Sequence, residues 1–390
     1  MLNMSKGEVT MLVLLDLSAA FDTIDHDILL DRLKNRYGVQ CSALKWFKSY
    51  ISERSQSVVI HDTTSSKLPL KFGVPQGSKL GPILFNSYIA PVSEVAQRNQ
   101  VNDQKYADDE QLILSFKPTF LNQEHAVRKM EKCISEIRDF LHDNKLCNNG
   151  DKTELLLIGA PNQLRKLQVS SINVDNVEIK TADHVRNLGV LFDKNMTMER
   201  QFNKMCRNAF LNLRNISKLR KNLDKETVKT AVNALVTPHL DYCNGLLYGI
   251  TNSMLSKLQV AQNSAVRLIE RLKKHDSVSH SRKQLHWLPI PATIQFKLMM
   301  ITWKAVNSQA PVYIQELIQA KTEQNHDLRS NHKHLLAEPP SCNKNKFEDR
   351  AFSHAAPKLW NTLPVACRMM KTMEGFKKNL KTYMFKKFYD

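Results

Sequence analysis

Two adjacent carboxylates, Asp108 and Asp109, lie in the sequence YADD between two short strand-prone runs. A tight turn there would hold both acids at the tip of a hairpin. Neighbouring carboxylates repel each other and lose hydration when partly buried, so a cation is expected beside them. A divalent metal that prefers oxygen ligands, such as Mg²⁺, is the simplest candidate. Taken alone, the stretch is more typical of a solvated turn than of a metal site.

A third carboxylate, Asp16, ends the apolar run VTMLVLLD at residues 9–16. A continuous apolar run of this length is typical of a strand buried on both faces. If this strand and the YADD hairpin are neighbours in one sheet, the three acids meet at one edge. Such a set can hold two Mg²⁺ ions roughly 3.5–4 Å apart, which suits attack by a hydroxyl and departure of pyrophosphate.

Three further stretches add to these acids. LLDLSAAFD places Phe21 five residues after Asp16, GVPQGS places Gln76 in a Pro-Gly turn, and GDKTELLL carries Lys152 after a long helical pattern. In this order and spacing the set resembles the palm of reverse transcriptases, and most of all that of LINE-type (non-LTR) retrotransposons of the jockey-like group. The resemblance covers nearly the whole chain, continuing through VRNLGVLFD, QNSAVRLI, LHWLPI and AFSHAAPKLWNTLP.

This resemblance implies an RNA-directed DNA polymerase that transfers a nucleotide from a dNTP to the 3′-hydroxyl of a primer. Its partners would be an RNA template and a DNA primer, and its cofactor two Mg²⁺ ions, for which Mn²⁺ can substitute. Asp16, Asp108 and Asp109 would be the catalytic, metal-binding acids. The carbonyl of Leu17 would also face a metal.

The resemblance also implies a nucleotide-binding set. Phe21 would lie under the sugar of the incoming nucleotide, where a bulky ring excludes a 2′-hydroxyl and so selects dNTP over NTP. Gln76 would contact the nucleotide, and Gly73 and Gly77 would allow close approach of the backbone. Lys152 would protonate the pyrophosphate or bind its charge as a catalytic residue. The alternatives are a core aromatic for Phe21, a polar turn residue for Gln76 and a solvated surface lysine for Lys152.

Other positions acquire supporting roles by the same resemblance. Asp22 would support the site, and Tyr106 would pack beside the primer end. Gly189 would sit in a tight hairpin at the primer-grip position, although a simple turn glycine is the alternative. Two residues depart from the pattern of the group: Glu110, where Thr is more usual, would add a negative charge beside the metals, and Lys79, where an apolar residue is usual, would add a positive charge near the nucleotide turn.

The formal net charge of the 390 residues is +18, and it is unevenly placed. Residues 1–160 hold 19 Lys and Arg against 20 Asp and Glu, whereas residues 161–390 hold 37 against 18. A basic excess this large in the second half indicates a polyanion partner, either nucleic acid or an acidic membrane surface. Nucleic acid agrees with the resemblance, and the alternative without a partner is a solvated basic face.

The predicted fold class is α+β, a right-hand polymerase palm with an antiparallel sheet and packed helices that lacks most of the fingers. We expect a palm at residues 1–195, an all-α thumb at 196–285 and a basic helical region at 286–390. Within the first part, periodicity predicts helices at 25–36, 41–51, 81–98 and 121–146. Strands are predicted at 9–16, 55–61, 67–72, 153–159, 172–180 and 185–193, and a mobile loop at 322–350.

The seven cysteines are widely spaced and form no CxxC pair, which fits free thiols in a reducing compartment. We therefore expect an intracellular protein of the nucleus, the cytoplasm or both. No apolar run approaches the roughly 18 residues needed to span a bilayer, and the first residues are not typical of a signal peptide. The sequence leaves the oligomeric state open.

Only 15 residues precede Asp16, where reverse transcriptases normally carry basic fingers. We therefore expect an N-terminally truncated copy with little activity on its own. The competing hypothesis is a non-catalytic nucleic-acid-binding remnant whose acids are idle. An RNA-dependent RNA polymerase would also use paired aspartates, but Phe21 argues against it.

Overall fold

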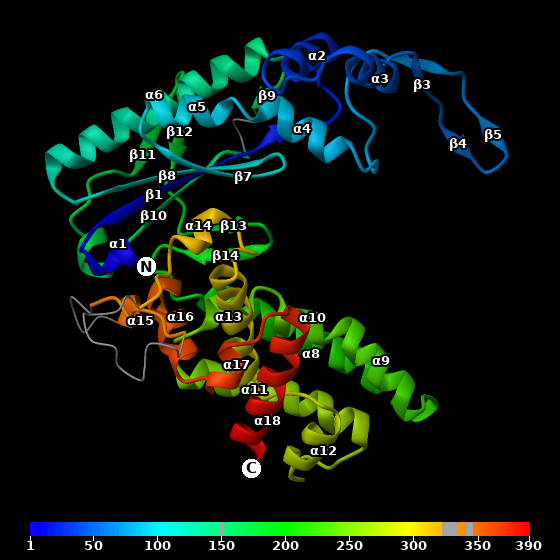
Figure 1. The fold of residues 1–390 in the computed structure, drawn as a ribbon, viewed down its shortest axis with the longest axis vertical. Helices are drawn as coiled ribbons and strands as arrows, with labels where there is room; N and C mark the ends of the chain where they lie inside the picture. Colours follow the sequence, from blue (N-terminus) through cyan, green and yellow to red (C-terminus); the bar gives the residue numbers. More distant parts are fainter. Residues whose placement is uncertain (149–151, 322–333, 341–345) are drawn as a thin grey trace. The chain divides into compact units, whose positions relative to one another are not determined.

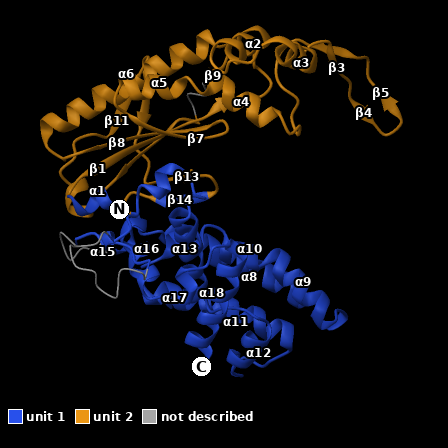
Figure 2. Cartoon of the chain, viewed as in Figure 1, with its two compact units in different colours: residues 1–6, 190–192, 196–390 blue, residues 7–189, 193–195 orange. Residues whose placement is uncertain are grey.

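The apolar run that ends before Asp16 forms a central strand, β1 (Val9–Leu15), in the computed structural model, which describes residues 1–148, 152–321, 334–340 and 346–390. The chain divides into two compact units (Figure 2). Unit 2 holds residues 7–189 and 193–195, and unit 1 holds residues 1–6, 190–192 and 196–390. Each unit has its own buried core.

The sheet of unit 2 has four strands in the order β10-β1-β8-β7, with every neighbouring pair antiparallel. β7 (Asn102–Tyr106) and β8 (Asp109–Phe116) form the hairpin predicted around YADD, and β10 (Glu154–Ile158) is the strand predicted at 153–159. β1 lies between β8 and β10, so its backbone donors and acceptors pair on both edges. The mixture of helices and antiparallel sheet predicted from the sequence is therefore confirmed for this unit.

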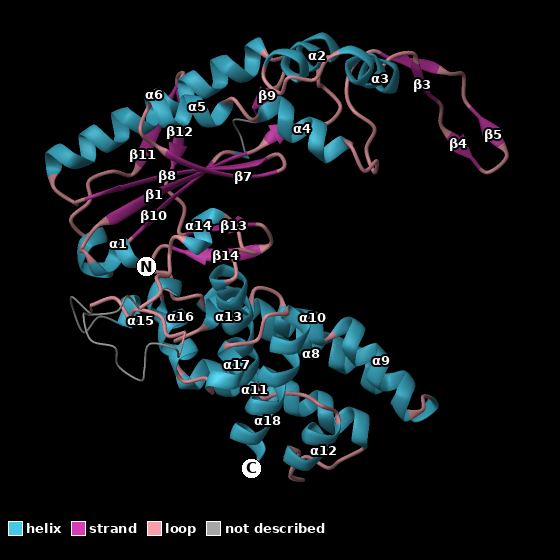
Figure 3. Ribbon diagram, viewed as in Figure 1, coloured by secondary structure: helices cyan, strands magenta, loops and turns pink. Residues whose placement is uncertain are grey.

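One face of this sheet is covered by helices, among them α5 (Val92–Arg98) and α6 (Phe120–Asp143) (Figure 3). Side chains alternate between the faces of a strand, so β1 sends Val9, Met11, Val13 and Leu15 into the helix-covered core. The helix predicted at 121–146 buries the apolar positions expected for it: Ala126, Met130, Cys133, Ile134, Ile137 and Leu141.

Several predicted elements are wrong in their continuity. The strand expected at 185–193 is divided into β13 (His184–Asn187) and β14 (Val190–Asp193) by a turn at Leu188 and Gly189, which have φ values of 45° and 82°. The helix expected at 81–98 is split into α4 (Gly81–Ile89) and α5, because Pro91 lacks the amide hydrogen that a continuous helix would need there and instead heads α5. The strand expected at 172–180 is a hairpin of β11 (Ser171–Val174) and β12 (Val177–Lys180). Its turn residues Asp175 and Asn176 have φ values of 49° and 66°, which a two-residue type I′ turn requires.

The segment between the first strand and α4 begins with two helices, α2 (His26–Asn35) and α3 (Cys41–Ile51). Asp25 caps α2, because its carboxylate accepts hydrogen bonds from the amides of Asp27 and Ile28. A ribbon then extends from α3 (Figure 1), with β3 (Arg54–Gln56) paired to β6 (Leu68–Leu70) and β4 (Val59–Ile60) paired to β5 (Thr63–Thr64). The strand predicted at 55–61 is thus divided into β3 and β4, and the strand predicted at 67–72 is shortened to β6.

The remaining elements of unit 2 are short. They are β2 (Leu17–Ser18), β9 (Cys147–Asn148), α7 (Pro161–Leu164) and β13 (His184–Asn187). β2 pairs with β9 directly after Asp16.

Unit 1 is helical apart from β14 (Val190–Asp193), which runs across the unit boundary. Its elements are α1 (Leu2–Ser5), α8 (Glu199–Leu219), η2 (Arg220–Asn222), α9 (Lys225–Leu235), α10 (Thr237–Asp241), η3 (Asn244–Leu247), α11 (Asn252–Glu270), α12 (Ser279–Gln284), α13 (Ile290–Val306), α14 (Val312–Gln315), α15 (Lys346–Arg350), α16 (Phe352–Asn361), α17 (Val365–Arg368) and α18 (Met373–Tyr389).

The buried side chains of this unit form one cluster at residues 190–294 and another at 288–384, in which Trp360 is fully buried. Of the loop predicted at 322–350, residues 322–333 and 341–345 lie outside the described residues, and 346–350 form α15 and not a loop. No helix in the described part of the chain is long and apolar enough to cross a membrane.

Candidate active site

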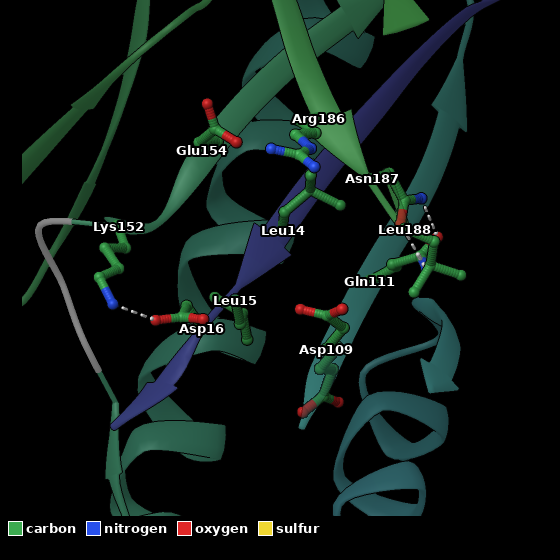
Figure 4. Close-up of a pocket in the computed structure, with 11 residues that line it drawn as sticks. Leu14, Leu15, Asp16, Asp109, Gln111, Lys152, Glu154, Arg186, Asn187 and Leu188 are labelled. Carbon is green, nitrogen blue, oxygen red and sulfur yellow. Dashed lines mark hydrogen bonds and ion pairs between the residues drawn. The ribbon is translucent and has the colours of Figure 1, made fainter. Parts of the chain in front are cut away.

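A pocket of about 370 Å³ opens on the face of the unit 2 sheet opposite its helices (Figure 4). It lies where β1 and β10 approach the start of β8 and the end of β13. The residues that line it are Leu14, Leu15, Asp16, Asp109, Glu110, Gln111, Lys152, Glu154, Arg186, Asn187 and Leu188. Three of the predicted catalytic residues, Asp16, Asp109 and Lys152, therefore share one cavity.

Strand register brings Asp16 and Asp109 together. Leu15 of β1 is paired with Glu110 of β8, so the next step of the same antiparallel register sets Asp16 opposite Asp109. Because side chains alternate along a strand, Asp109 and Gln111 direct their side chains to the pocket, whereas Glu110, although part of the pocket lining, directs its side chain to the helices. The convergence of acids at one sheet edge, expected from the sequence, is present for this pair.

The hairpin turn holds Asp108, the first acid of the YADD sequence. Ala107 adopts a φ of 54° in the two-residue connection between β7 and β8, and Asp108 is its other residue. Asp108 does not line the pocket, but its charge acts on Asp109. Tyr106 is exposed at the end of β7, where its ring is available to a ligand.

Electrostatics in the pocket favour a positive partner. Partial burial, followed by the charges of Asp108 and Asp16, raises the pKa of Asp109 above its ordinary value. Lys152 Nζ lies 3.2 Å from Asp16 Oδ2 and offsets part of this negative charge. The contact is not aligned as a hydrogen bond, since Asp16 Oδ2 has no hydrogen-bond partner among the described residues. Both side chains are partly exposed, so this ion pair contributes little to stability.

The donor set suits a hard cation that keeps part of its hydration. Among the residues the structure describes, no group of three or more His, Cys, Asp and Glu side chains forms a ready metal site. Mg²⁺ commonly takes only one or two carboxylates and completes its shell with water and substrate phosphates. The carboxylates of Asp16 and Asp109 fit that requirement, and Asp16 Oδ2 accepts no hydrogen bond among the described residues. Leu17, the other predicted ligand, lies in β2 opposite Asn148.

The GVPQGS loop folds onto the segment that follows Asp16. The amide of Gly73 donates to the Ile24 carbonyl at 2.8 Å, and the amide of Val74 donates to the Phe21 carbonyl at 2.9 Å. Gly73 has a φ of 85°, and a Cβ there would lie 2.9 Å from backbone atoms of Asp22. A positive φ and so close a backbone contact both require glycine at this position. The close approach predicted for this loop is therefore made to the protein's own backbone.

The predicted nucleotide-binding residues gather in this second cluster and do not line the pocket. Gln76 Nε2 donates to Asp22 Oδ1 at 2.9 Å. Phe21 is half-buried and stacks on Phe85 with ring centroids 4.6 Å apart. Gly77 has a φ of 76° with open space around its Cα. Asp22 thus supports the loop, and the roles of Phe21, Gln76 and Gly77 toward a nucleotide stay predictions.

Several pocket residues were missed by the sequence reasoning. Gln111 and Asn187 exchange two hydrogen bonds: Gln111 Nε2 donates to Asn187 Oδ1 at 3.1 Å, and Asn187 Nδ2 donates to Gln111 Oε1 at 2.8 Å. Figure 4 shows Arg186 directing its guanidinium toward Glu154 on the other side of the pocket. Gln111 could have been found, because it lies two residues after Asp109 and so shares its face.

The expected role of Glu110 is wrong. Its side chain is 3% exposed on the helix side of the sheet, across from Lys105 of β7. Burial raises the pKa of Glu110 to about 7, with Lys105 opposing this shift. The pKa of Cys133 on α6 is raised to about 12, first by burial and then by the charge of Glu110. Glu110 therefore adds its charge behind the sheet and not beside the metal-binding acids.

Comparison with known proteins gives a family match for this unit. Residues 2–192 match the family model described as "Reverse transcriptase (RNA-dependent DNA polymerase)". The probable RNA-directed DNA polymerase from transposon BS of Drosophila melanogaster is 25% identical over 267 residues, which is 66% of this chain and 28% of that protein. The RNA-directed DNA polymerase from mobile element jockey of Drosophila melanogaster is 25% identical over 277 residues, 68% of this chain and 29% of that protein.

The chain thus spans less than a third of the length of these curated relatives. Among solved structures, telomerase from Candida albicans with a fragment of telomeric RNA aligns at a TM-score of 0.31 and 15% identity, over 67% of this chain and 46% of that one. A score of that size does not establish a shared fold.

Proposed function

Because residues 2–192 belong to the reverse transcriptase family, and the chain is similar to polymerases of jockey-type non-LTR retrotransposons, we propose that this chain is an RNA-directed DNA polymerase. The reaction joins the 3′-hydroxyl of a primer to the α-phosphate of a dNTP and releases pyrophosphate. The observation that carries the proposal is the placement of Asp16 opposite Asp109 in a pocket that Lys152 also lines.

Asp16, Asp108 and Asp109 would hold the cofactor, two Mg²⁺ ions, together with the Leu17 carbonyl. When bound, the ions lower the pKa of the attacking hydroxyl and neutralise the leaving pyrophosphate. Burial, followed by the charges of Asp108 and Asp16, raises the pKa of Asp109, and bound cations would offset the repulsion among these carboxylates, which supports this assignment. Lys152 lies close enough to Asp16 to meet negative charge that develops at the pyrophosphate, or to donate a proton to it.

The second cluster serves the incoming nucleotide. Phe21 is fixed by its stack on Phe85, so its ring can act as a rigid floor that a 2′-hydroxyl would strike. Gln76 is held by Asp22 in a loop whose glycines permit close approach of a ligand to the backbone. These two contacts would select dNTP over NTP and keep its base and sugar in register with the template.

Unit 2 corresponds in this proposal to the palm, and the helices at 196–285 to a thumb that holds the template–primer duplex. The excess of 37 Lys and Arg over 18 Asp and Glu in residues 161–390 supports phosphate contacts there and at 286–390. RNA template, DNA primer and dNTP are therefore the partners we propose. We propose the nucleus, the cytoplasm or both as the place of action.

Single-nucleotide addition to a labelled DNA primer on an RNA template, in Mg²⁺ and then in Mn²⁺, tests the proposal. We expect slow incorporation of dNTP over NTP that is lost in Asp109→Asn. The matched control is Asp143→Asn at the exposed end of α6, which leaves the rate unchanged. Equal use of NTP and dNTP would favour an RNA polymerase.

A second candidate function is nucleic-acid binding without catalysis. It is favoured by the basic excess of the second half and by the absence, among the described residues, of a group of three potential ligands already gathered for a metal. Salt-dependent RNA binding that is unchanged in Asp16→Ala, with no incorporation in either metal, would establish it and exclude the polymerase.

A further inference from the structure

Two aromatic rings lie stacked on the outer surface of α3, away from the pocket. Trp46 is 53% exposed, and its ring stacks on that of Tyr50 with centroids 5.5 Å apart and planes 12° from parallel. The two residues are four apart, so they share one side of the helix. Leu44 and Phe47 pack against the core of unit 2 and attach α3 by another side. Tyr50 is itself half-buried and packs against the same core, so Trp46 is the ring that is exposed and not needed to anchor the helix.

One cationic group contacts this pair, and two more lie on the same helix. Arg54, in the first residue of β3, places its guanidinium carbon 5.6 Å from the centre of the Tyr50 ring and donates a hydrogen bond of 3.0 Å to the Tyr50 carbonyl. Lys45 and Lys48 are exposed on the same helix. The guanidinium of Arg54 and the ring of Tyr50 thus form a fixed continuation of the aromatic stack.

The segment that carries these rings has a positive net charge, although the first part of the chain around it is nearly neutral. Residues 41–72 hold five Lys and Arg against two Asp and Glu, although residues 1–160 are balanced between the two signs. Within the described residues, no ion pair joins any of these five cations to an acid. They are Lys45, Lys48, Arg54, Lys67 and Lys71. Their charge is therefore available to an anionic partner.

We propose that this aromatic and basic surface binds a single strand of RNA, whose bases stack on Trp46 and whose phosphates contact Lys45, Lys48 and Arg54. Exposed rings combined with cations are the features by which proteins hold unpaired strands, since every base offers a face for stacking. A duplex already uses those faces internally. A protein partner fits less well, because lysine is depleted at the centres of protein interfaces.

If the chain is the polymerase proposed above, the bound strand is the unpaired part of the RNA template, and the surface keeps that part single-stranded. This assignment of the strand rests on the proposed function. Binding of single-stranded RNA by α3 does not, since it needs neither metal nor catalysis.

Tryptophan fluorescence of the full chain tests the proposal with an oligo(U) 20-mer. Trp303 and Trp360 are fully buried and Trp287 is half-buried, so Trp46 is the tryptophan a base can reach. We expect the oligomer to quench the emission of the wild-type chain and of Trp287→Phe, and to leave that of Trp46→Phe unquenched. By anisotropy of a labelled oligomer, Trp46→Ala should raise Kd at least about tenfold, and Lys45→Glu with Lys48→Glu should reduce its salt dependence.

Three results would overturn the inference: full quenching in Trp46→Phe, an unchanged Kd in Trp46→Ala, or equal Trp46-dependent binding of a duplex of the same length. Self-association lost in Trp46→Ala, with RNA binding retained, would show a protein interface instead. Asp109→Asn separates the two proposals, because it should abolish incorporation and leave quenching intact. Quenching without any wild-type incorporation would remove the polymerase and keep the RNA surface.

Discussion

Gln111 and Asn187 are joined by two side-chain hydrogen bonds, of 3.1 and 2.8 Å, at the rim of the pocket that contains Asp109. Gln111 belongs to the strand that carries Asp109, and Asn187 ends β13 just before the turn at Leu188 and Gly189. The pair therefore fixes that turn relative to the catalytic acids. A primer end held by the turn would depend on the pair for its position.

Breaking this pair should loosen the turn without removing a catalytic group. We expect Asn187→Ala to lower the free energy of unfolding by about 1–2 kcal/mol and to raise KM for the primer–template several-fold, with a smaller change in kcat. Denaturant unfolding and primer-extension kinetics measure the two effects. A double-mutant cycle with Gln111→Ala should show coupling of about 1 kcal/mol. Strict additivity would mean that the two amides act independently.

Lys152 should matter for chemistry far more than for stability. Its ion pair with Asp16 joins side chains that are 66% and 33% exposed, so Lys152→Met should change the free energy of unfolding by less than about 0.5 kcal/mol. The rate of a single nucleotide addition should fall by about 10²–10⁴-fold, the usual contribution of a positioned proton donor. Lys166→Met, an exposed site on the same unit, is the control. A rate equal to that of the control would make Lys152 a surface lysine.

Glu110 should give the folded state a distinct pH dependence. Its folded pKa is about 7 against an ordinary 4.5, so the folded state retains a proton that the unfolded chain releases. Stability contributed by this group is thus complete below pH about 4.5 and is lost as pH rises to about 7. Over that interval the free energy of unfolding of the wild type should fall by roughly 3 kcal/mol on account of this group, and Glu110→Gln should not show this fall. Unfolding at pH 5 and pH 8 measures the difference, and Glu124→Gln on the outside of α6 should keep the wild-type slope. An unchanged slope in Glu110→Gln would contradict the buried, proton-retaining state.

Substitution of Phe21 distinguishes a purely structural role of its ring from a role in nucleotide selection. Removing its stack on Phe85 in Phe21→Ala should cost about 2–4 kcal/mol of unfolding free energy. If the ring also excludes a 2′-hydroxyl, the same variant should incorporate NTP more readily relative to dNTP, by about tenfold or more. Competition between the two nucleotides in a single-addition assay measures this ratio. Loss of stability with an unchanged ratio would leave Phe21 as a core aromatic only.

The parts of the site that follow from strand periodicity could be predicted from the sequence. The run before Asp16 and the YADD hairpin form neighbouring strands, and the apolar positions of α6 are buried as expected. The same alternation shows that Glu110 must face away from Asp109. The expectation for Glu110 failed because it counted charge by proximity in sequence and not by strand face.

Other features depend on tertiary contacts that sequence patterns do not contain. GVPQGS is recognisable as a turn, but its docking on residues 21–24 and the bond from Gln76 to Asp22 arise from packing. The pairing of Gln111 with Asn187 joins two distant segments. The Asp175–Asn176 pair, in contrast, is a local sequence signal for a hairpin turn, and it divides the one long strand predicted there.

The central claim is that Asp16 and Asp109 form one metal-dependent site for nucleotide transfer. The most direct test measures a single dNTP addition on an RNA template across a titration of Mg²⁺ and Mn²⁺, in the wild type, Asp16→Asn and Asp109→Asn. The account predicts metal-dependent addition by the wild type and a loss of at least about 10³-fold in each variant, because each removes charge that the metals require. Metal-dependent addition that survives in either variant would contradict it.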